Sequence, residues 1–198
     1  MFTGIIAQVG TCRGFRQARR ALLVEAPGLA SRLAVGESLA VDGVCLSVVA
    51  ADRDGILFDL ARETSERTTL GGLRPGAKVN LERSLTPSTP ISGHLVSGHV
   101  DGVGRVLRVV SRPPGRRVTV SFPAALRPFL VPQGSVAVAG VSLTIAALGL
   151  SSFEIELIPL TLAGTNLGLV RAGTKVNLEC DMIGKYVYNC LSRGRPQD

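Results

Sequence analysis

Apolar residues alternate with small or polar residues over short stretches, a pattern typical of strands with one buried face. Within 38–48, the apolar face comprises Leu39, Val41, Val44, Leu46 and Val48. Gly43 marks a bend where the alternation changes phase. Such stretches recur with turn signals about every 8–12 residues, which favours closed barrels over a sandwich with free edges.

The pattern changes near the C-terminus, where apolar residues take helical spacing. They are Met182, Ile183, Tyr186, Val187, Cys190 and Leu191. This stripe has no copy elsewhere and predicts an amphipathic helix in 182–198. A barrel surface or the same helix of a second subunit would cover it, so we expect self-association.

An internal repeat organises the rest of the chain. A shift of 97 positions aligns 38–82 with 135–179 without a gap, and 19 of 45 positions are identical. Unrelated segments of ordinary composition would share about three. A shift of 94 aligns MFTGIIAQVG at the start with LVSGHVDGVG at 95–104. The repeat predicts an all-β chain with domains at 1–90 and 91–181 and a C-terminal helix and tail at 182–198.

Charge and composition exclude several functions. The net charge is +7 and the pI is about 9.9, yet the basic residues form no long runs and aromatics are only 4% of the chain. Because single-stranded nucleic acids bind through basic grooves lined with stacking aromatics, we expect no nucleic-acid partner. Four cysteines without C-x-x-C spacing and two histidines suggest neither a zinc site nor a disulfide framework, so we expect thiols in a reducing cytoplasm.

Residues 128–153 carry no charge and are numerous enough to span a bilayer. Pro132, Gly134 and Gly140 interrupt this stretch, and its Ser and Thr residues recur at strand spacing. We therefore interpret it as buried strand, and we expect a soluble chain without a membrane partner. The N-terminus shows no signal-peptide pattern, which favours a cytoplasmic location.

Several blocks, in this order, resemble the riboflavin synthase family: MFTGII, GVCLSV, SGHLVSGHVDGVG, GVSLTI and VNLECDMIGKYV. The resemblance covers essentially the whole chain. It implies two tandem six-stranded Greek-key β-barrels and a C-terminal helix through which three chains associate as a homotrimer. It also implies a transferase that needs no metal or other cofactor. The reaction is the dismutation of two 6,7-dimethyl-8-ribityllumazine molecules to riboflavin and 5-amino-6-(D-ribitylamino)uracil.

The family's pockets are formed by the first barrel of one chain facing the second barrel of its neighbour, so two lumazines share one site. Lumazine synthase is a further partner that the resemblance raises. A non-catalytic lumazine- or flavin-binding protein of the antenna type is the alternative function. Such relatives keep the barrels but lose polar site residues, which this chain retains.

Five residues are the catalytic candidates that the resemblance implies: His99, Ser142, Thr144, Asp181 and Cys45. His99 stands where the first repeat has Ile5, so a polar ring replaces an apolar side chain. An imidazole there can hydrogen-bond the heterocycle or carry a proton near neutral pH, although a lone histidine more often has a structural role. We assign the other histidine, His94, a surface or packing role.

Ser142 and Thr144 share one strand face, as Cys45 and Ser47 do in the first copy. By resemblance these pairs line the second and first pockets and polarise or hydrate the ring carbon that is attacked. The alternative is that small hydroxyls satisfy nearby backbone groups. Ser142 stands at the position equivalent to Cys45 in the second repeat. Cys45 could therefore be a pocket wall or position a water as well as act as a nucleophile.

Asp181 follows the last predicted strand, and Arg83 takes its place in the first copy. It can cap the predicted helix or assist proton removal from the lumazine methyl group, and the two roles are compatible. The substrate-binding residues that the resemblance implies are Phe2, Thr3, Gly4, Ile5, Ile6, Ser38, Cys45, Leu46, Ser47, Ala61, Glu63, Thr64, Gly98, His99, Val100, Gln133, Ser142, Leu143, Thr144, Ile158 and Thr161.

Four positions depart from the family pattern. Gln133 stands where a lysine commonly precedes the strand, and Ala139 replaces an Asp or Asn before Gly140. Leu160 replaces a polar residue, and Ser92 replaces a Gly before Gly93. These changes affect the second pocket rather than the residues expected to carry the chemistry.

Overall fold

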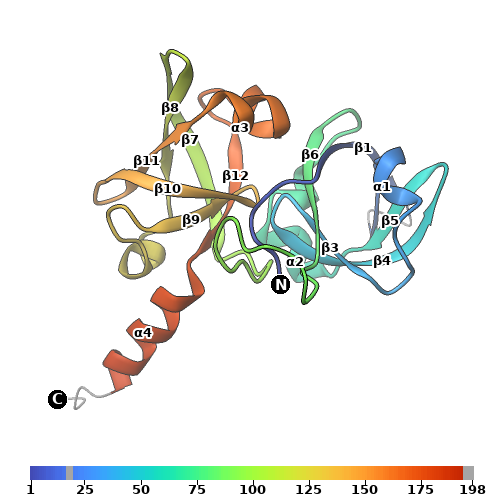
Figure 1. Ribbon diagram of the computed structural model, residues 1–198, viewed down its shortest axis with the longest axis horizontal. Coiled ribbons are helices and arrows are strands. Elements are labelled where there is room, and N and C mark those ends of the chain that lie inside the picture. The colour runs from blue at the N-terminus through green and yellow to red at the C-terminus, as the bar shows by residue number, and fades with distance from the viewer. Residues whose placement is uncertain (17–19, 194–198) are drawn as a thin grey trace.

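Strands dominate the computed structural model, which describes residues 1–16 and 20–193 (Figure 1). The first barrel consists of β1 (Gln8–Arg16), β2 (Ala21–Glu25), β3 (Ser38–Val41), β4 (Val44–Asp52), β5 (Gly55–Asp59) and β6 (Lys78–Arg83). The second consists of β7 (Gly102–Arg112), β8 (Gly115–Ser121), β9 (Ser135–Val138), β10 (Val141–Leu148), β11 (Ser152–Leu157) and β12 (Lys175–Cys180). The predicted pair of six-stranded barrels is confirmed.

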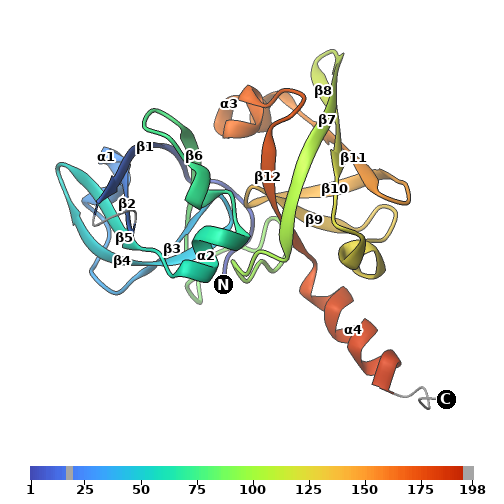
Figure 2. The same cartoon turned by 180° about the vertical axis from the view of Figure 1, so that it is seen from behind.

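Both barrels have the same antiparallel topology. Around the first barrel the strands follow the order β1-β2-β5-β4-β3-β6, and the second repeats it as β7-β8-β11-β10-β9-β12. In each, the last strand returns to pair with the third and first strands, which gives the Greek-key connection. The two views of the ribbon show the barrels side by side (Figures 1 and 2).

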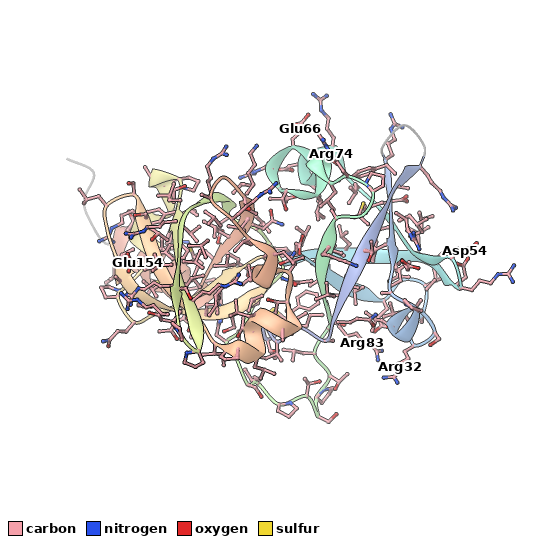
Figure 3. The ribbon with its side chains drawn as sticks, turned by 90° about the horizontal axis from the view of Figure 1, so that it is seen from above. Arg32, Asp54, Glu66, Arg74, Arg83 and Glu154 are labelled. Carbon is pink, nitrogen blue, oxygen red and sulfur yellow. The ribbon has the colours of Figure 1, made fainter. Side chains whose placement is uncertain are left out.

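Each barrel encloses its own apolar core, as the alternation predicts. Val44, Leu46 and Val48 of β4 point inward and are at most 6% exposed. Phe153 and Ile155 of β11 occupy the second core. Charged side chains such as Arg74 and Glu154 project from the outer surfaces (Figure 3). The uncharged stretch 128–153 includes β9 and β10 and the start of β11, as expected, and no helix among the described residues could cross a bilayer.

Short helices that the sequence pattern did not predict connect the strands. They are α1 (Pro27–Ala30), α2 (Arg62–Arg67), α3 (Pro159–Gly164) and the 3-10 turns η1 (Leu70–Gly72), η2 (Ala124–Phe129) and η3 (Asn166–Leu169). One or two turns are too short to show a 3.6-residue period. In α2, ion pairs of 2.7 Å join Arg62 to Glu66 and Glu63 to Arg67. Both pairs are exposed, so each adds only about 0.3–0.5 kcal/mol.

Helix α4 (Met182–Arg193) confirms the predicted C-terminal helix and points away from both barrels (Figure 1). The tail at 194–198 lies outside the described residues. One side of α4 meets η2, where the rings of Tyr188 and Phe129 pack edge to face at 5.2 Å. No other part of the chain that the structure describes covers its apolar stripe: Ile183, Tyr186 and Leu191 are 62%, 67% and 69% exposed.

The barrels meet at two equivalent hairpin turns, Asp42-Gly43 and Ala139-Gly140. All four residues have positive φ, which suits a two-residue hairpin turn. The turns are in close contact, because a Cβ on Gly43 would lie 2.7 Å from the backbone nitrogen of Gly140. Ala139 adopts φ 48° without the polar side chain that usually tolerates that conformation.

Two segments, 1–6 and 95–100, run between the barrels, and we call them the lead-in segments. Phe2 and Val96 bridge them antiparallel. Each segment reaches the barrel of the other repeat: Ile6 packs against the second core and Val100 against the first. The predicted limits 1–90 and 91–181 divide the sequence, whereas in space each lead-in segment packs against the core of the opposite barrel.

Candidate active site

A cavity of about 400 Å³ opens on the first barrel. It is lined by Val44, Cys45, Ala61, Glu63, Thr64, Arg67, Thr68, Gly98, His99, Val100 and Asp101. These residues come from the start of β4, from α2 with the residue on either side of it, and from the lead-in segment 95–100 with Asp101 directly after it. The cavity therefore brings together seven of the predicted site residues, from Cys45 to Val100, although they are far apart in the sequence.

Local geometry explains why these side chains face the cavity. Cys45 lies between the buried residues Val44 and Leu46, so the strand pleat turns its thiol away from the core. His99 is exposed, and its backbone N–H donates to Ser97 Oγ at 3.2 Å. It also lines a second hollow of about 240 Å³ beside α4, which includes Met182 and Tyr186. His99 thus lies between the first-barrel cavity and the C-terminal helix.

The second barrel carries an equivalent group of predicted residues on equivalent elements. Ser142 and Thr144 lie on β10, Thr161 on α3, and the lead-in segment 1–6 takes the place of 95–100. Ser142 donates its backbone N–H to the carbonyl of Gly4 at 2.8 Å, as Cys45 does to Gly98 at 2.9 Å. Beside this group, Thr3, Ile5 and Ile6 line a hollow of about 520 Å³.

His94, for which the sequence suggested a surface or packing role, lies in this second group. His94 Nδ1 is 2.7 Å from Ser142 Oγ, and its Nε2 is buried without a hydrogen-bond partner among the described residues. A surface or packing role therefore does not fully describe His94, because its imidazole is hydrogen-bonded to the hydroxyl of Ser142, a predicted catalytic residue. The only sequence signal was the close spacing of two histidines in SGHLVSGH.

Electrostatics favour the neutral form of His94. Burial lowers the pKa of its imidazole below 6.5, and the negative charge of Asp181 partly opposes that effect. A neutral imidazole in contact with a serine hydroxyl can accept its proton. Asp181 also caps α4, since its Oδ1 accepts the backbone N–H of Ile183 at 3.0 Å, which confirms the capping interpretation.

Several predicted binding residues are not available to a ligand through their side chains. Phe2 is fully buried between the barrels, and Leu46 points into the first core. Thr3 is 3% exposed and its hydroxyl donates to Glu82. Gln133 is exposed in the turn before β9 with φ 61°. Ligand contacts at Phe2 and Leu46 would therefore come from their backbone atoms or from neighbouring residues.

The other predicted binding residues are more accessible. Ser38 and Ser47 are paired across β3 and β4, Leu143 is half-buried on β10, and Ile158, just before α3, is 57% exposed. Among residues 1–16 and 20–193, no three His, Cys, Asp or Glu side chains gather as a metal-binding group. The site as described offers hydrogen-bonding and proton-transfer groups.

The five catalytic candidates fall into two groups within one chain. Cys45 and His99 belong to the first-barrel cavity, which contains none of Ser142, Thr144 and Asp181. The latter three belong to the second barrel. Each barrel thus carries its own group of candidate residues, and the group on the first barrel lines the cavity of about 400 Å³.

Comparison with known proteins identifies this arrangement. The Lumazine binding domain family matches twice, at residues 3–84 and 97–181. Riboflavin synthase of Bacillus subtilis (strain 168) is 38% identical over 195 residues, covering 98% of this chain and 91% of that protein. Riboflavin synthase of Mycobacterium tuberculosis is 41% identical over 197 residues, covering 94% and 96%. A solved structure of LumP with riboflavin has the same fold, with a TM-score of 0.84, 24% identity and coverage of 91% and 99%.

Proposed function

The chain belongs to the riboflavin synthase family, and on this premise we propose that it converts two 6,7-dimethyl-8-ribityllumazine molecules to riboflavin and 5-amino-6-(D-ribitylamino)uracil. One lumazine donates a four-carbon unit and the other accepts it. The atoms of the two substrates equal those of the two products, so the reaction needs no external oxidant, reductant or water. The observation that carries this proposal is the pair of equivalent barrels with unlike polar groups, Cys45 and His99 on the first and Ser142 with His94 on the second.

Identical substrates with different roles require two similar but unequal sites. The first barrel offers Cys45 and His99. The second offers Ser142, the equivalent of Cys45, together with His94, whereas Ile5 takes the position of His99. Bringing the two heterocycles together in the correct orientation can contribute about 7–11 kcal/mol toward the barrier. The barrels therefore act chiefly by holding donor and acceptor face to face.

The second pocket supplies the more reactive pair. Neutral His94 accepts the proton of Ser142, which lets the hydroxyl or a water it holds add to a ring carbon of one lumazine while the C=N electron pair moves to the ring nitrogen. The nucleophile leaves again and recovers its proton from His94 when the carbon unit is transferred, so no water is consumed. Asp181, whose charge acts on His94, stabilises the imidazolium that results. In the first pocket, Cys45, Thr64 and His99 hold the partner lumazine, and His99 donates a hydrogen bond to its ring.

The two pockets meet between chains in a homotrimer. The uncovered stripe of α4 supports this assembly, because exposed apolar residues on a projecting helix favour association. Ile183→Asp should dissociate the trimer to monomers in analytical ultracentrifugation. Asn189→Asp places the same charge on another face of α4 and should leave the trimer intact. Association with lumazine synthase stays a prediction.

The direct test is to incubate the purified protein with the lumazine alone and to follow flavin absorbance. Flavin should form without added cofactor, and Ser142→Ala should reduce kcat by about 100-fold or more. Ser111→Ala, on the exposed end of β7, is the matched control and should keep wild-type kcat. Tight lumazine binding without flavin formation would refute the enzyme proposal and favour a non-catalytic lumazine-binding protein.

A further inference from the structure

Two buried glutamates occupy equivalent positions at the ends of the last strand of each barrel. Glu82 ends the VNLE motif of β6, and Glu179 ends the same motif of β12. Their exposed fractions are 6% and 3%. Burial of a carboxylate is unfavourable unless hydrogen bonds compensate for the lost hydration, so their partners indicate what these residues do.

Both carboxylates bind a lead-in segment through the same three hydrogen bonds. Glu82 Oε1 accepts the backbone N–H and the hydroxyl of Thr3 at 2.6 and 2.7 Å, and Oε2 accepts the N–H of Gly4 at 3.0 Å. Glu179 accepts the N–H and hydroxyl of Ser97 at 2.6 and 2.7 Å and the N–H of Gly98 at 3.0 Å. Hydrogen bonds to an ionised acceptor are stronger and more directional than neutral ones.

Each held segment then contacts the pocket of the opposite barrel. The carbonyl of Gly98 accepts the N–H of Cys45 at 2.9 Å, and a Cβ on Gly98 would lie 2.6 Å from that of Cys45. His99 is the next residue, and its N–H donates to the same Ser97 hydroxyl that Glu179 binds. Glu179 of the second barrel is thereby connected to Cys45 and His99 in the first-barrel cavity.

The reverse connection has the same form. The carbonyl of Gly4 accepts the N–H of Ser142 at 2.8 Å, and the carbonyl of Thr3 accepts the N–H of His94 at 3.1 Å. Glu82 of the first barrel is therefore connected to Ser142 and His94 in the second.

We propose that Glu82 and Glu179 are positioning residues that act crosswise, each setting the geometry of the pocket on the barrel opposite its own. This inference rests on the proposed function for its catalytic consequence, but its structural content does not depend on turnover. Glutamine tests it because an amide keeps one acceptor oxygen and places an N–H donor against the N–H groups of the lead-in segment. Glutamine has nearly the same size as glutamate, but only one of its two terminal atoms can accept hydrogen bonds.

The chain provides two internal reporters, since its only histidines are His94 in one pocket and His99 in the other. Their imidazole 15N and 1H signals can be followed by long-range heteronuclear NMR. Glu179→Gln should shift the His99 signals and leave those of His94 in place. Glu82→Gln should shift His94 and leave His99 in place. Glu25→Gln, on β2, is the matched control and should shift neither.

The kinetic arm uses the lumazine reaction. Glu179→Gln and Glu82→Gln should each reduce kcat by up to about 100-fold through misplacement of the pocket groups, with a smaller change in KM. Glu25→Gln should retain wild-type kcat. If a glutamine variant fails to fold, Ser97→Ala and Thr3→Val each remove the hydroxyl that joins the glutamate to the backbone N–H two residues on, of His99 and of Ile5, and should shift His99 and His94 respectively by a smaller amount.

The inference is supported if each glutamine variant shifts the NMR signals of the opposite pocket's histidine alone and also has a reduced kcat. Unchanged signals and kcat in folded Glu179→Gln overturn it, as do equal shifts of both histidines, which indicate general destabilisation. If the wild-type protein forms no flavin, the proposed function fails, yet the NMR arm still decides whether the two glutamates position the opposite pockets.

Discussion

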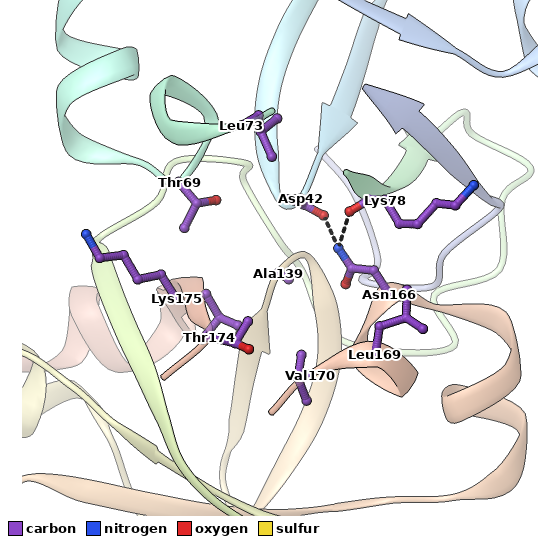
Figure 4. A pocket seen from close by; sticks show the side chains of 11 residues that line it. Asp42, Thr69, Leu73, Lys78, Ala139, Asn166, Leu169, Val170, Thr174 and Lys175 are labelled. Atoms are coloured by element: carbon purple, nitrogen blue, oxygen red, sulfur yellow. Dashed lines mark hydrogen bonds between the residues drawn. The ribbon is translucent and has the colours of Figure 1, made fainter. Parts of the chain in front are cut away.

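Replacing Asp42 by Asn removes a carboxylate that is buried where the two barrels meet. Its Oδ1 accepts the N–H of Asn80 at 2.8 Å. The same oxygen accepts the side-chain amide of Asn166 at 2.9 Å (Figure 4). It lines an inter-barrel cavity of about 230 Å³ with Lys78 and Lys175. Both lysine side chains extend away from the carboxylate, so neither neutralises it directly (Figure 4).

Burial raises the pKa of Asp42 from 3.8 to about 7, with the two hydrogen bonds opposing the effect. Between these values the folded chain holds a proton that the unfolded chain has released. Stability is therefore greatest below about pH 4 and declines as pH rises through 7. At about 1.4 kcal/mol per pKa unit, this carboxyl costs about 4 kcal/mol when fully ionised. Asn keeps an acceptor oxygen for both bonds and has no charge to desolvate.

Urea unfolding at constant protein concentration, at about pH 5 and about pH 8.5, measures the effect. Because the cost builds up between about pH 4 and about pH 7, Asp42→Asn should be more stable than wild type by about 1–2 kcal/mol near pH 5 and by about 4 kcal/mol near pH 8.5. Asp59→Asn, at the exposed end of β5, is the control and should follow the wild-type curve. Parallel pH dependence of wild type and Asp42→Asn would refute the assignment of this cost to Asp42.

Three further outcomes follow from the geometry. Ala139→Asn should raise the free energy of unfolding by about 1 kcal/mol in urea, because Asn tolerates φ 48° better than Ala; an unchanged value would contradict the strain assignment. Gly43→Ala should lower it by about 2–3 kcal/mol, since the added Cβ meets Gly140 backbone at 2.7 Å; wild-type stability would show that the turns can separate freely. The rate of flavin formation should fall in acid, at a pH below the ordinary imidazole range, because burial lowers the pKa of His94 and its protonation removes the base; His94→Gln should lose that pH dependence along with most activity, and a variant that still lost its rate in acid would show that another group is responsible.

Sequence patterns predicted the fold because barrels are built from local alternation and repetition. The duplication at shifts of 94 and 97 positions located both barrels, and the helical stripe located α4. The short helices α2 and α3 escaped the pattern because each has only six residues. Seven predicted site residues line one cavity. The resemblance to a known family implied that grouping, whereas the alternation of apolar and polar residues could not have predicted it.

By itself, the sequence determined two equivalent barrels with Cys45 and Ser142 at matching positions, because strand period and repeat register are properties of the chain alone. Only the tertiary structure decided which groups share a pocket. His94 reaches Ser142 across 48 positions and Glu179 reaches Ser97 across 82. Such contacts arise because the lead-in segments pass between the barrels, and that crossing depends on how two closed surfaces pack rather than on any local pattern.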